Sequence, residues 1–373
     1  MLKINASELG KMIYRHYEMK VPLMIFGPPG CAKSAVAYQT AQSIAKAKGK
    51  EFYSWSDLTM EKKKELIQNP KGSFVFCDQR ISQMDSTDLR GIPNMLEKDM
   101  LDVLPMSWVI YFTRPDADGF IFFDEIKLAA PVVAGSAYQI IHDRSISDRR
   151  LGNDVFLLAA GNRATDKAYV HDMPFPLKDR FDEVEVYPDV KTWTDWASKE
   201  KVNSHVIMFL NWKESNLFRP NDKGIDKGAT PRGWARGSKM IGEYEIDSND
   251  AQMMLAVSVG EAAATEFKAY VKHFQSLNWK KIYEDPASIK DFESDKLFAI
   301  AGGISEQYSK IAGEEKQYAV FEKMVEIITN MPEEFSIITL RMMQRGNENG
   351  FRKNIKNCKS FQKTCSGLAK FIL

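Results

Sequence analysis

The stretch of sequence that decides the fold follows a short apolar run and reads Gly27-Pro28-Pro29-Gly30-Cys31-Ala32-Lys33-Ser34. It matches the pattern G-x-x-x-x-G-K-[ST], except that Ala32 stands where the last glycine usually is. In that pattern, backbone N–H groups of a turn point toward phosphates, and the following helix N-terminus favours negative charge. Lys33 would bring a positive charge to the phosphates, and Ser34 a hydroxyl group to Mg²⁺. We therefore predict that residues 27–34 bind a nucleotide.

The segments on either side of this loop fit the same interpretation. Residues 21–26 form an apolar run short enough to be a buried parallel strand, and the alanine-rich residues 33–48 suit a helix. Alanine at position 32 is compatible with the turn if its φ angle is negative. Cys31 would make binding sensitive to thiol modification if the helix N-terminus lowers the pKa of its thiol.

A second apolar stretch, residues 119–123, ends in two acids, Asp124 and Glu125. Carboxylates next to a buried strand are costly unless a cation or hydrogen-bond donors compensate them. Asp124 could hold Mg²⁺ through water, and Glu125 could orient and activate an attacking water molecule. Because Asp124 follows Lys33 by 124 − 33 = 91 positions, we expect additional elements in the region 56–113.

Asn162 follows another apolar run, residues 155–160. If the two strands are neighbours, its amide would lie beside Asp124 and Glu125, within reach of the water or the terminal phosphate. The alternative is an ordinary turn former after a strand. Two arginines occur at comparable positions, Arg180 before a strand expected at 183–187 and Arg232 near a helix start. Arg180 is either a surface charge or a guanidinium group that reaches a nucleotide in the next subunit.

The order of the apolar runs predicts the fold class. Strand candidates lie at 51–55, 73–77, 107–112, 119–123, 155–160 and 183–187. Helical patterns between several of them predict a three-layer α/β domain with a parallel sheet. After about residue 190 the apolar residues recur at helical spacing, so an all-α region should follow. Residues 131–142 suggest a helix, and 144–153 a hairpin with a Gly-Asn turn.

Composition bounds the class of protein. The 373 residues are 44% hydrophobic and 27% charged, which excludes disordered, collagen-like and coiled-coil chains. The net charge is +1, from 51 basic and 50 acidic residues. From Arg341 onward there are eight basic residues and one acid, a net +7. This tail is either a solvated helical segment or a contact surface for nucleic acid or an acidic partner.

The chain has few cysteines and no long apolar segment. Its four cysteines have neither a disulfide pattern nor metal-ligand spacing, so a reducing compartment is expected. The N-terminus lacks an apolar signal core, and runs such as residues 21–26 are too short to cross a bilayer. We expect a cytoplasmic protein with no membrane partner.

Taken in this order, the motifs resemble those of AAA+ ATPases, and more narrowly the MoxR-like group. The narrower likeness rests on the loop 27–34, the Asn162 segment, Arg180-Phe181, and the segments Asp88-Leu89-Arg90-Gly91-Ile92-Pro93, Thr230-Pro231-Arg232, 261–267 and 332–335. The resemblance implies an α/β P-loop nucleotide-binding domain at 1–190, an α-helical lid at 191–276 and a helical C-terminal extension with a basic tail at 277–373. It also implies a homo-oligomer, a ring of about six subunits with ATP and Mg²⁺ at the interfaces.

The resemblance also implies residue roles. Gly27, Pro28, Pro29, Gly30, Cys31, Ala32, Lys33 and Ser34 would form the nucleotide loop, with Ser34 and Asp124 serving Mg²⁺. Asp124 and Glu125 would be the Walker B pair, Asn162 the first sensor, Arg180 the finger acting in trans and Arg232 the second sensor. In related ATPases, hairpins such as 144–153 line a central pore.

Three functions follow from these observations. The first is an ATP hydrolase that remodels a protein partner, in the family often together with a von Willebrand factor A domain protein. The second is a nucleic-acid motor or loader, which the basic tail and the hairpin arginines Arg149 and Arg150 support. The third is a nucleotide-gated scaffold that hydrolyses ATP poorly, against which the complete Asp124–Glu125 pair argues.

Overall fold

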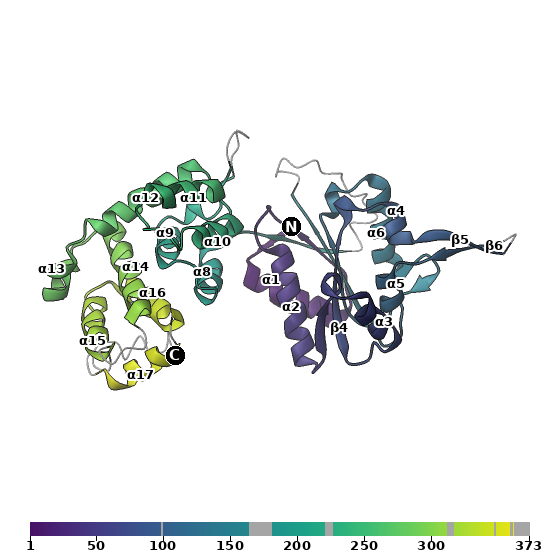
Figure 1. Cartoon of the computed structure of the whole chain (residues 1–373), viewed down its shortest axis with the longest axis horizontal. Helices are drawn as coiled ribbons and strands as arrows, with labels where there is room; N and C mark the ends of the chain where they lie inside the picture. The colour runs from purple at the N-terminus through teal and green to yellow at the C-terminus, as the bar shows by residue number, and fades with distance from the viewer. Residues whose placement is uncertain are drawn as a thin grey trace. The chain divides into compact units, whose positions relative to one another are not determined.

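The computed structural model describes residues 1–97, 100–163, 181–220, 227–311, 317–346, 348–358 and 361. The chain divides into two compact units, Met1–Tyr187 and Pro188–Leu373. The first unit is α/β and the second is helical (Figure 1). The first unit ends close to the boundary expected at residue 190, and the second spans both helical regions expected after it.

A seven-stranded sheet forms the centre of the first unit in its described residues, and all its strand pairs are parallel. The strand order is β1-β11-β2-β10-β7-β4-β3. These strands are β1 (Leu2–Ile4), β2 (Leu23–Phe26), β3 (Glu51–Ser54), β4 (Ser73–Arg80), β7 (Asp118–Asp124), β10 (Asp154–Gly161) and β11 (Asp182–Val186). The central strands are almost entirely buried, as expected for a parallel sheet covered on both faces.

Helices cover both faces of this sheet, which confirms the three-layer α/β fold. One face packs against α1 (Ala6–Met19) and α2 (Lys33–Ala47). The other packs against four helices, α3 (Met60–Gln68), α4 (Ser86–Arg90), α5 (Ser107–Phe112) and α6 (Pro131–Asp143). Alanines 37, 41 and 45 on α2 are buried, and their small side chains let this helix approach the sheet closely.

Residues 107–112 form helix α5, so the strand expected there is wrong. The segment buries Trp108, Val109, Tyr111 and Phe112. A short run of large apolar residues can be buried equally well as a strand or as a helix, and periodicity alone does not distinguish them. Here the run lies against the sheet as a layer rather than inside it.

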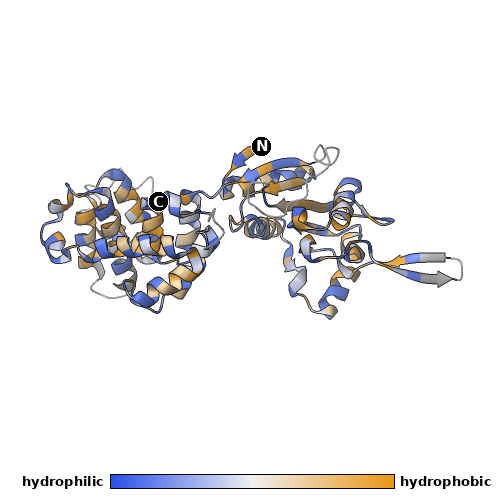
Figure 2. Cartoon of the chain, turned by 90° about the horizontal axis from the view of Figure 1, so that it is seen from above, coloured by the Kyte–Doolittle hydropathy of each residue, from blue (hydrophilic) through white to orange (hydrophobic). Residues whose placement is uncertain are grey.

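The region expected to hold additional elements contains an antiparallel ribbon, β5 (Ile92–Glu97) and β6 (Met100–Leu104). It extends from the first unit in both views (Figures 1 and 2). The hairpin expected at 144–153 is present as β8 (Ser145–Ile146) and β9 (Arg149–Arg150). Its turn lies at Ser147 and Asp148, not at the Gly-Asn pair, and Ser147 has a φ of 54°.

The second unit is helical throughout its described residues, apart from one bridge between Arg219 and Ala229. The helices are α8 (Val190–Lys199), α9 (Ser204–Trp212), α10 (Pro231–Met240), α11 (Asn249–Val259), α12 (Glu261–Gln275), α13 (Trp279–Glu284), α14 (Ser294–Ile311), α15 (Gln317–Ile328), α16 (Glu333–Gly346) and α17 (Glu348–Asn357). One hydrophobic core joins them. Apolar and polar residues alternate along these helices, as expected where each buries one face (Figure 2). Among the described residues, no helix is both long enough and apolar enough to span a membrane.

Candidate functional site

The predicted site residues of the first unit meet at one edge of the sheet. Because β2, β10, β7 and β4 are parallel, their carboxyl ends lie together there. Gly161 is in register with Phe26, and Ala159 with Phe123. The loop after β2, Asn162 after β10 and Asp124 at the end of β7 therefore share this edge. In parallel sheets with helices on both faces, ligands bind at this carboxyl edge.

The backbone of the loop after β2 depends on small residues. A Cβ atom on Gly27 would lie 2.7 Å from the Val186 carbonyl oxygen, so β11 leaves no room for a side chain. Gly30 has a φ of 79° and Ala32 a φ of 69°, both in the left-handed region. The condition set for Ala32, a negative φ, is therefore not met. An alanine there is strained by about 1 kcal/mol or more, a cost found typically where the local conformation has a function.

Lys33 begins α2 and is buried, with 8% of its surface exposed. Its Nζ donates hydrogen bonds to the carbonyl oxygens of Gly27 at 2.7 Å and Pro28 at 3.0 Å, and to Oδ1 of Asn162 at 3.4 Å. Neutral oxygens surround the ammonium group in these contacts. The next residue after Asn162, Arg163, pairs with Glu185 at 3.0 Å and ties the ends of β10 and β11 together.

Cys31 is packed into the loop, with 4% of its surface exposed. Burial raises the pKa of its thiol, and this effect outweighs the opposing charge of Lys33. The expectation that the helix N-terminus lowers this pKa is therefore wrong. A buried thiol with a raised pKa reacts slowly, because the thiolate is the nucleophile.

Ser34 and Asp124 supply a donor set that suits Mg²⁺. The Ser34 hydroxyl donates to Oδ2 of Asp124 at 2.7 Å, joining the start of α2 to the end of β7. Magnesium prefers oxygen ligands and is usually held by one or two carboxylates together with phosphate oxygens. No group of three or more His, Cys, Asp or Glu side chains in the described ranges is placed to hold a metal. The pair fits a metal whose remaining ligands come from phosphates and water.

Glu125 has an unusual backbone conformation, with a φ of 56°. Its N–H donates to Oδ1 of Asp124 at 2.8 Å. Its carboxylate accepts a hydrogen bond of 2.5 Å from the hydroxyl of Ser82, which lies in the short helical turn Ile81–Gln83 after β4. The turn after β4 thus contacts the carboxylate of Glu125. Sequence reasoning missed Ser82, because nothing in its local pattern distinguishes it.

Asp78 on β4 is a further acid that sequence reasoning missed. Burial, followed by the charge of Asp124, raises its pKa to about 6. Its Oδ1 is buried and has no hydrogen-bond partner among the described residues. The rule applied to Asp124, an acid at the end of a buried apolar run, would have found it directly after residues 73–77.

The two predicted arginines, Arg180 and Arg232, are not among the residues that meet at this edge in the described structure. Arg180 lies outside the described residues. Arg232 belongs to the second unit, near the start of α10, where Thr230 caps the helix by accepting from the Gly233 N–H at 3.0 Å. There Arg232 lines a pocket of that unit.

The parallel sheet, the loop between β2 and α2 and the acids at the end of β7 together define the α/β P-loop fold, here joined to a helical C-terminal region. No protein-family model matches the chain, and no curated protein matches it. Solved structures resemble it at low identity. ORC2 of Aeropyrum pernix, in its ADPNP–ADP complexes, has 10% identity and a TM-score of 0.36, with 94% of each chain covered.

Two further solved structures resemble the chain. The Holliday junction branch migration motor RuvB of Thermotoga maritima has 15% identity and a TM-score of 0.32, with 75% of each chain covered. NtrX of Brucella abortus, in complex with ATP, has 13% identity and a TM-score of 0.34, covering 87% of this chain and 70% of its own. At such scores, function has to be argued from the site itself.

Proposed function

We propose that this chain is an AAA+ ATPase that binds ATP with Mg²⁺ at the carboxyl edge of its sheet and hydrolyses it. One observation carries the proposal. Side chains from three separate segments converge there, with Ser34 and Asp124 2.7 Å apart and Lys33 and Asn162 3.4 Å apart. This combination of a buried ammonium group, a hydroxyl–carboxylate pair and an amide suits charged phosphates and a divalent cation.

Each residue then has a role in hydrolysis. The N–H groups of residues 27–34 and the Lys33 ammonium would bind phosphates, and Ser34 and Asp124 would hold Mg²⁺, which neutralises charge on them. Glu125 would orient the attacking water and accept its proton, and Asn162 would fix the water or the terminal phosphate. Phosphoryl transfer needs mainly positioning and charge neutralisation, which these groups can supply.

The remaining roles involve more than one subunit. We propose that the chain forms a ring of about six copies, in which Arg180 of one subunit completes the site of its neighbour. An arginine supplied in trans is worth roughly 10³–10⁵ in rate in well-studied nucleotide hydrolases. Arg232 would sense the nucleotide from the lid, residues 191–276, with residues 277–373 as an extension.

For the work done with ATP, we propose remodelling of a protein partner in the manner of the MoxR-like group. The order of the motifs supports it, and a von Willebrand factor A domain protein is the expected partner class. The β8–β9 hairpin presents Arg149 and Arg150 for gripping a substrate chain. The second candidate, action on nucleic acid, is favoured by one specific feature, the pocket of the second unit, whose lining includes Lys201, Arg232, Arg236 and Lys239.

The experiment that tests the shared site is the variant Arg180→Ala. We expect ATP turnover to fall by at least about 10³-fold while ATP affinity stays within a few-fold, because a trans arginine acts on the transition state. Turnover and the binding of a fluorescent ATP analogue would be measured on the same samples. Lys178→Ala, which removes a neighbouring positive charge, is the matched control and should keep its turnover. Normal turnover in Arg180→Ala would remove Arg180 from the site.

A further inference from the structure

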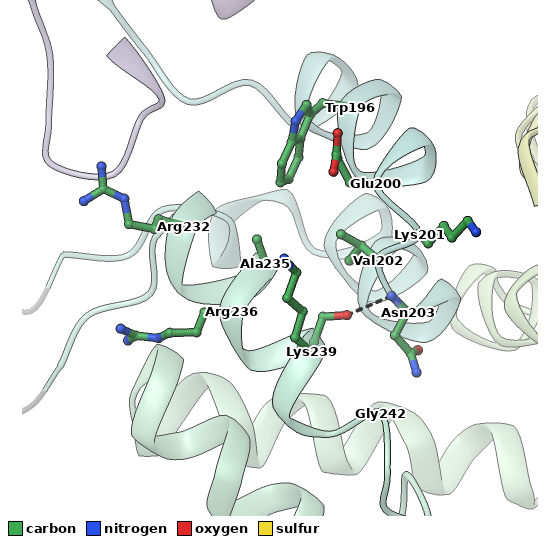
Figure 3. A pocket seen from close by; sticks show the side chains of 11 residues that line it. Trp196, Glu200, Lys201, Val202, Asn203, Arg232, Ala235, Arg236, Lys239 and Gly242 are labelled. Carbon is green, nitrogen blue, oxygen red and sulfur yellow. Dashed lines mark hydrogen bonds between the residues drawn. The ribbon is translucent and has the colours of Figure 1, made fainter. Parts of the chain in front are cut away.

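The second unit contains an open pocket of about 500 Å³ between α8, α10 and the turn that joins α8 to α9. Trp196 and Glu200 come from the α8 side, and Lys201, Val202 and Asn203 from the turn (Figure 3). The facing wall is α10, which supplies the buried Ser238 together with Arg232, Ala235, Arg236 and Lys239.

The lining of the pocket is strongly basic. It includes four basic side chains, Lys201, Arg232, Arg236 and Lys239, and one acid, Glu200. None of the four makes an ion pair or hydrogen bond within the ranges that the structure describes. Arg232, Arg236 and Lys239 are exposed, while the opposite side of α10 buries Trp234 and Gly237. These four basic side chains therefore do not stabilise the described fold through ion pairs.

The three cations of α10 form a row. They occupy positions i, i+4 and i+7, so they share one face of the helix and are spaced by about 6 and 4.5 Å along its axis. Arg232 and Arg236 extend toward the same side of α10, and Lys239 runs back along the helix toward Ala235 (Figure 3). Lys201 points away from this row. A cluster of positive charges on one face of a helix suits a ligand that carries several negative charges.

An aromatic side chain faces this row across the pocket. Trp196 is 36% exposed, which is high for a tryptophan. Its ring lies beside that of Trp193, which is 8% exposed, with the two centroids 6.3 Å apart and the two planes tilted by 51°. The exposed part of the Trp196 indole offers an aromatic surface to a flat partner.

The walls of the pocket are fixed relative to one another. The Asn203 N–H donates to the buried Ser238 hydroxyl at 2.8 Å, which ties the start of α9 to α10 (Figure 3). The Asn211 amide of α9 donates to the Thr194 hydroxyl of α8 at 3.0 Å. Through α9, these two hydrogen bonds link the helices that carry the cations and the indole.

From this arrangement we propose that the pocket binds a segment of single-stranded nucleic acid. Its phosphates lie beside Arg236 and Lys239, and one base stacks on Trp196. A positive groove beside an exposed aromatic ring is the usual arrangement for binding single strands without sequence preference. The assignment goes beyond ATP hydrolysis and does not depend on it, because binding is expected without nucleotide.

The test uses the full chain and a fluorescein-labelled 20-mer of deoxythymidine, without ATP, with affinity read by anisotropy. The double variant Arg236→Ala/Lys239→Ala should bind at least about tenfold more weakly, and its log–log salt dependence should be shallower by about one unit. Trp196→Ala should also lose about tenfold, whereas Trp196→Phe, which keeps a ring, should keep most of the affinity. Thermal unfolding of each variant confirms that it is folded.

The matched control is Lys272→Ala/Lys280→Ala, which removes the same charge from exposed positions on α12 and α13. It should bind within about twofold of the wild type. Equal weakening in both double variants would overturn the proposal, since only net charge would then matter. So would no binding by the wild type at low salt, or a labelled polyglutamate peptide that binds more tightly than the oligonucleotide and depends on Arg236 and Lys239.

Discussion

Strand β7 begins and ends with an aspartate, and the two aspartates differ in the hydrogen-bond donors that surround them. Asp118, at the amino end, has no exposed surface and accepts hydrogen bonds from Lys48 at 2.5 Å, Lys50 at 2.8 Å and Tyr17 at 2.8 Å. Asp124, at the carboxyl end, has the hydroxyl of Ser34 and one backbone N–H.

The pKa values of the buried acids show the same difference. Burial alone would raise the pKa of Asp118, but the hydrogen bonds from Lys48, Lys50 and Tyr17 outweigh it and lower the pKa. At the other end, burial and the charge of Asp124 raise the pKa of Asp78 to about 6. Fully compensated charge stabilises the fold, whereas uncompensated charge at an edge is ready for an external cation. We therefore expect the amino end to serve structure and the carboxyl end to serve the proposed nucleotide and Mg²⁺ binding.

The largest effect is expected from Asp118→Asn. The change leaves two lysines next to a buried neutral amide, and breaking a buried ion pair by removing one partner typically costs about 3–5 kcal/mol. The free energy of unfolding, measured with urea at pH 7.5, should fall by that amount. Asp154→Asn is the matched control, because Asp154 begins β10 but is 55% exposed and 3.7 Å from its lysine. A loss below about 1 kcal/mol in Asp118→Asn would contradict the structural role.

The pH dependence of stability should separate the two ends by sign. The folded-state pKa of Asp118 is lowered, so its stabilisation is present above its unfolded pKa of about 4 and is lost as the pH falls below it. The folded-state pKa of Asp78 is raised, because the native state favours the neutral carboxyl group. The stability associated with this protonated form is therefore fully present below pH 4 and is lost as the pH rises through about 6.

Asp78→Asn should therefore stabilise the protein by about 1–2 kcal/mol at pH 7.5 and change little at pH 4. Asp118→Asn should destabilise it at pH 7.5, with a smaller deficit near pH 4. Urea unfolding between pH 4 and 7.5, without nucleotide or Mg²⁺, measures both differences. If the two variants change stability in the same direction across this range, the contrast between the two ends fails.

The smallest effect is expected from Ser82→Ala. The Ser82 hydroxyl donates a hydrogen bond of 2.5 Å to a carboxylate oxygen of Glu125. Removing the hydroxyl leaves that oxygen free to accept a hydrogen bond from water. ATP turnover should rise about two- to fivefold, which corresponds to roughly 0.5–1 kcal/mol. Ser43→Ala, on the exposed side of α2, should leave turnover unchanged. A tenfold fall in Ser82→Ala would mean that Ser82 holds Glu125 in its working position.

The sequence predicted most of the carboxyl edge, because its residues follow apolar runs. The positions of Lys33, Asp124 and Asn162 at strand or helix ends were enough to bring them together once the strands were taken as parallel. The strand at 107–112 was wrong because Trp108 and Phe112 can be buried in either conformation. Ala32 occupies the turn with a positive φ, because a side chain of one carbon tolerates the strained conformation.

The amino edge was not predictable in this way. Tyr17, Lys48 and Asp118 are far apart in the sequence and belong to no motif, so only the assembled fold brings them together. At the carboxyl edge, Ser82 was missed for the same reason, because it reaches Glu125 only once β4 is placed beside β7. The roles of Arg180 and Arg232 remain proposals.

The central claim is that Glu125 hydrolyses ATP in an assembly of subunits. The most direct measurement is the ATPase rate per subunit against protein concentration, for the wild type and for Glu125→Gln, with and without single-stranded DNA. We predict that the wild-type rate rises cooperatively with concentration and that turnover disappears in Glu125→Gln while ATP still binds. Hydrolysis that continues unchanged in Glu125→Gln, or a wild-type enzyme that binds ATP but does not hydrolyse it at any concentration, would contradict the account.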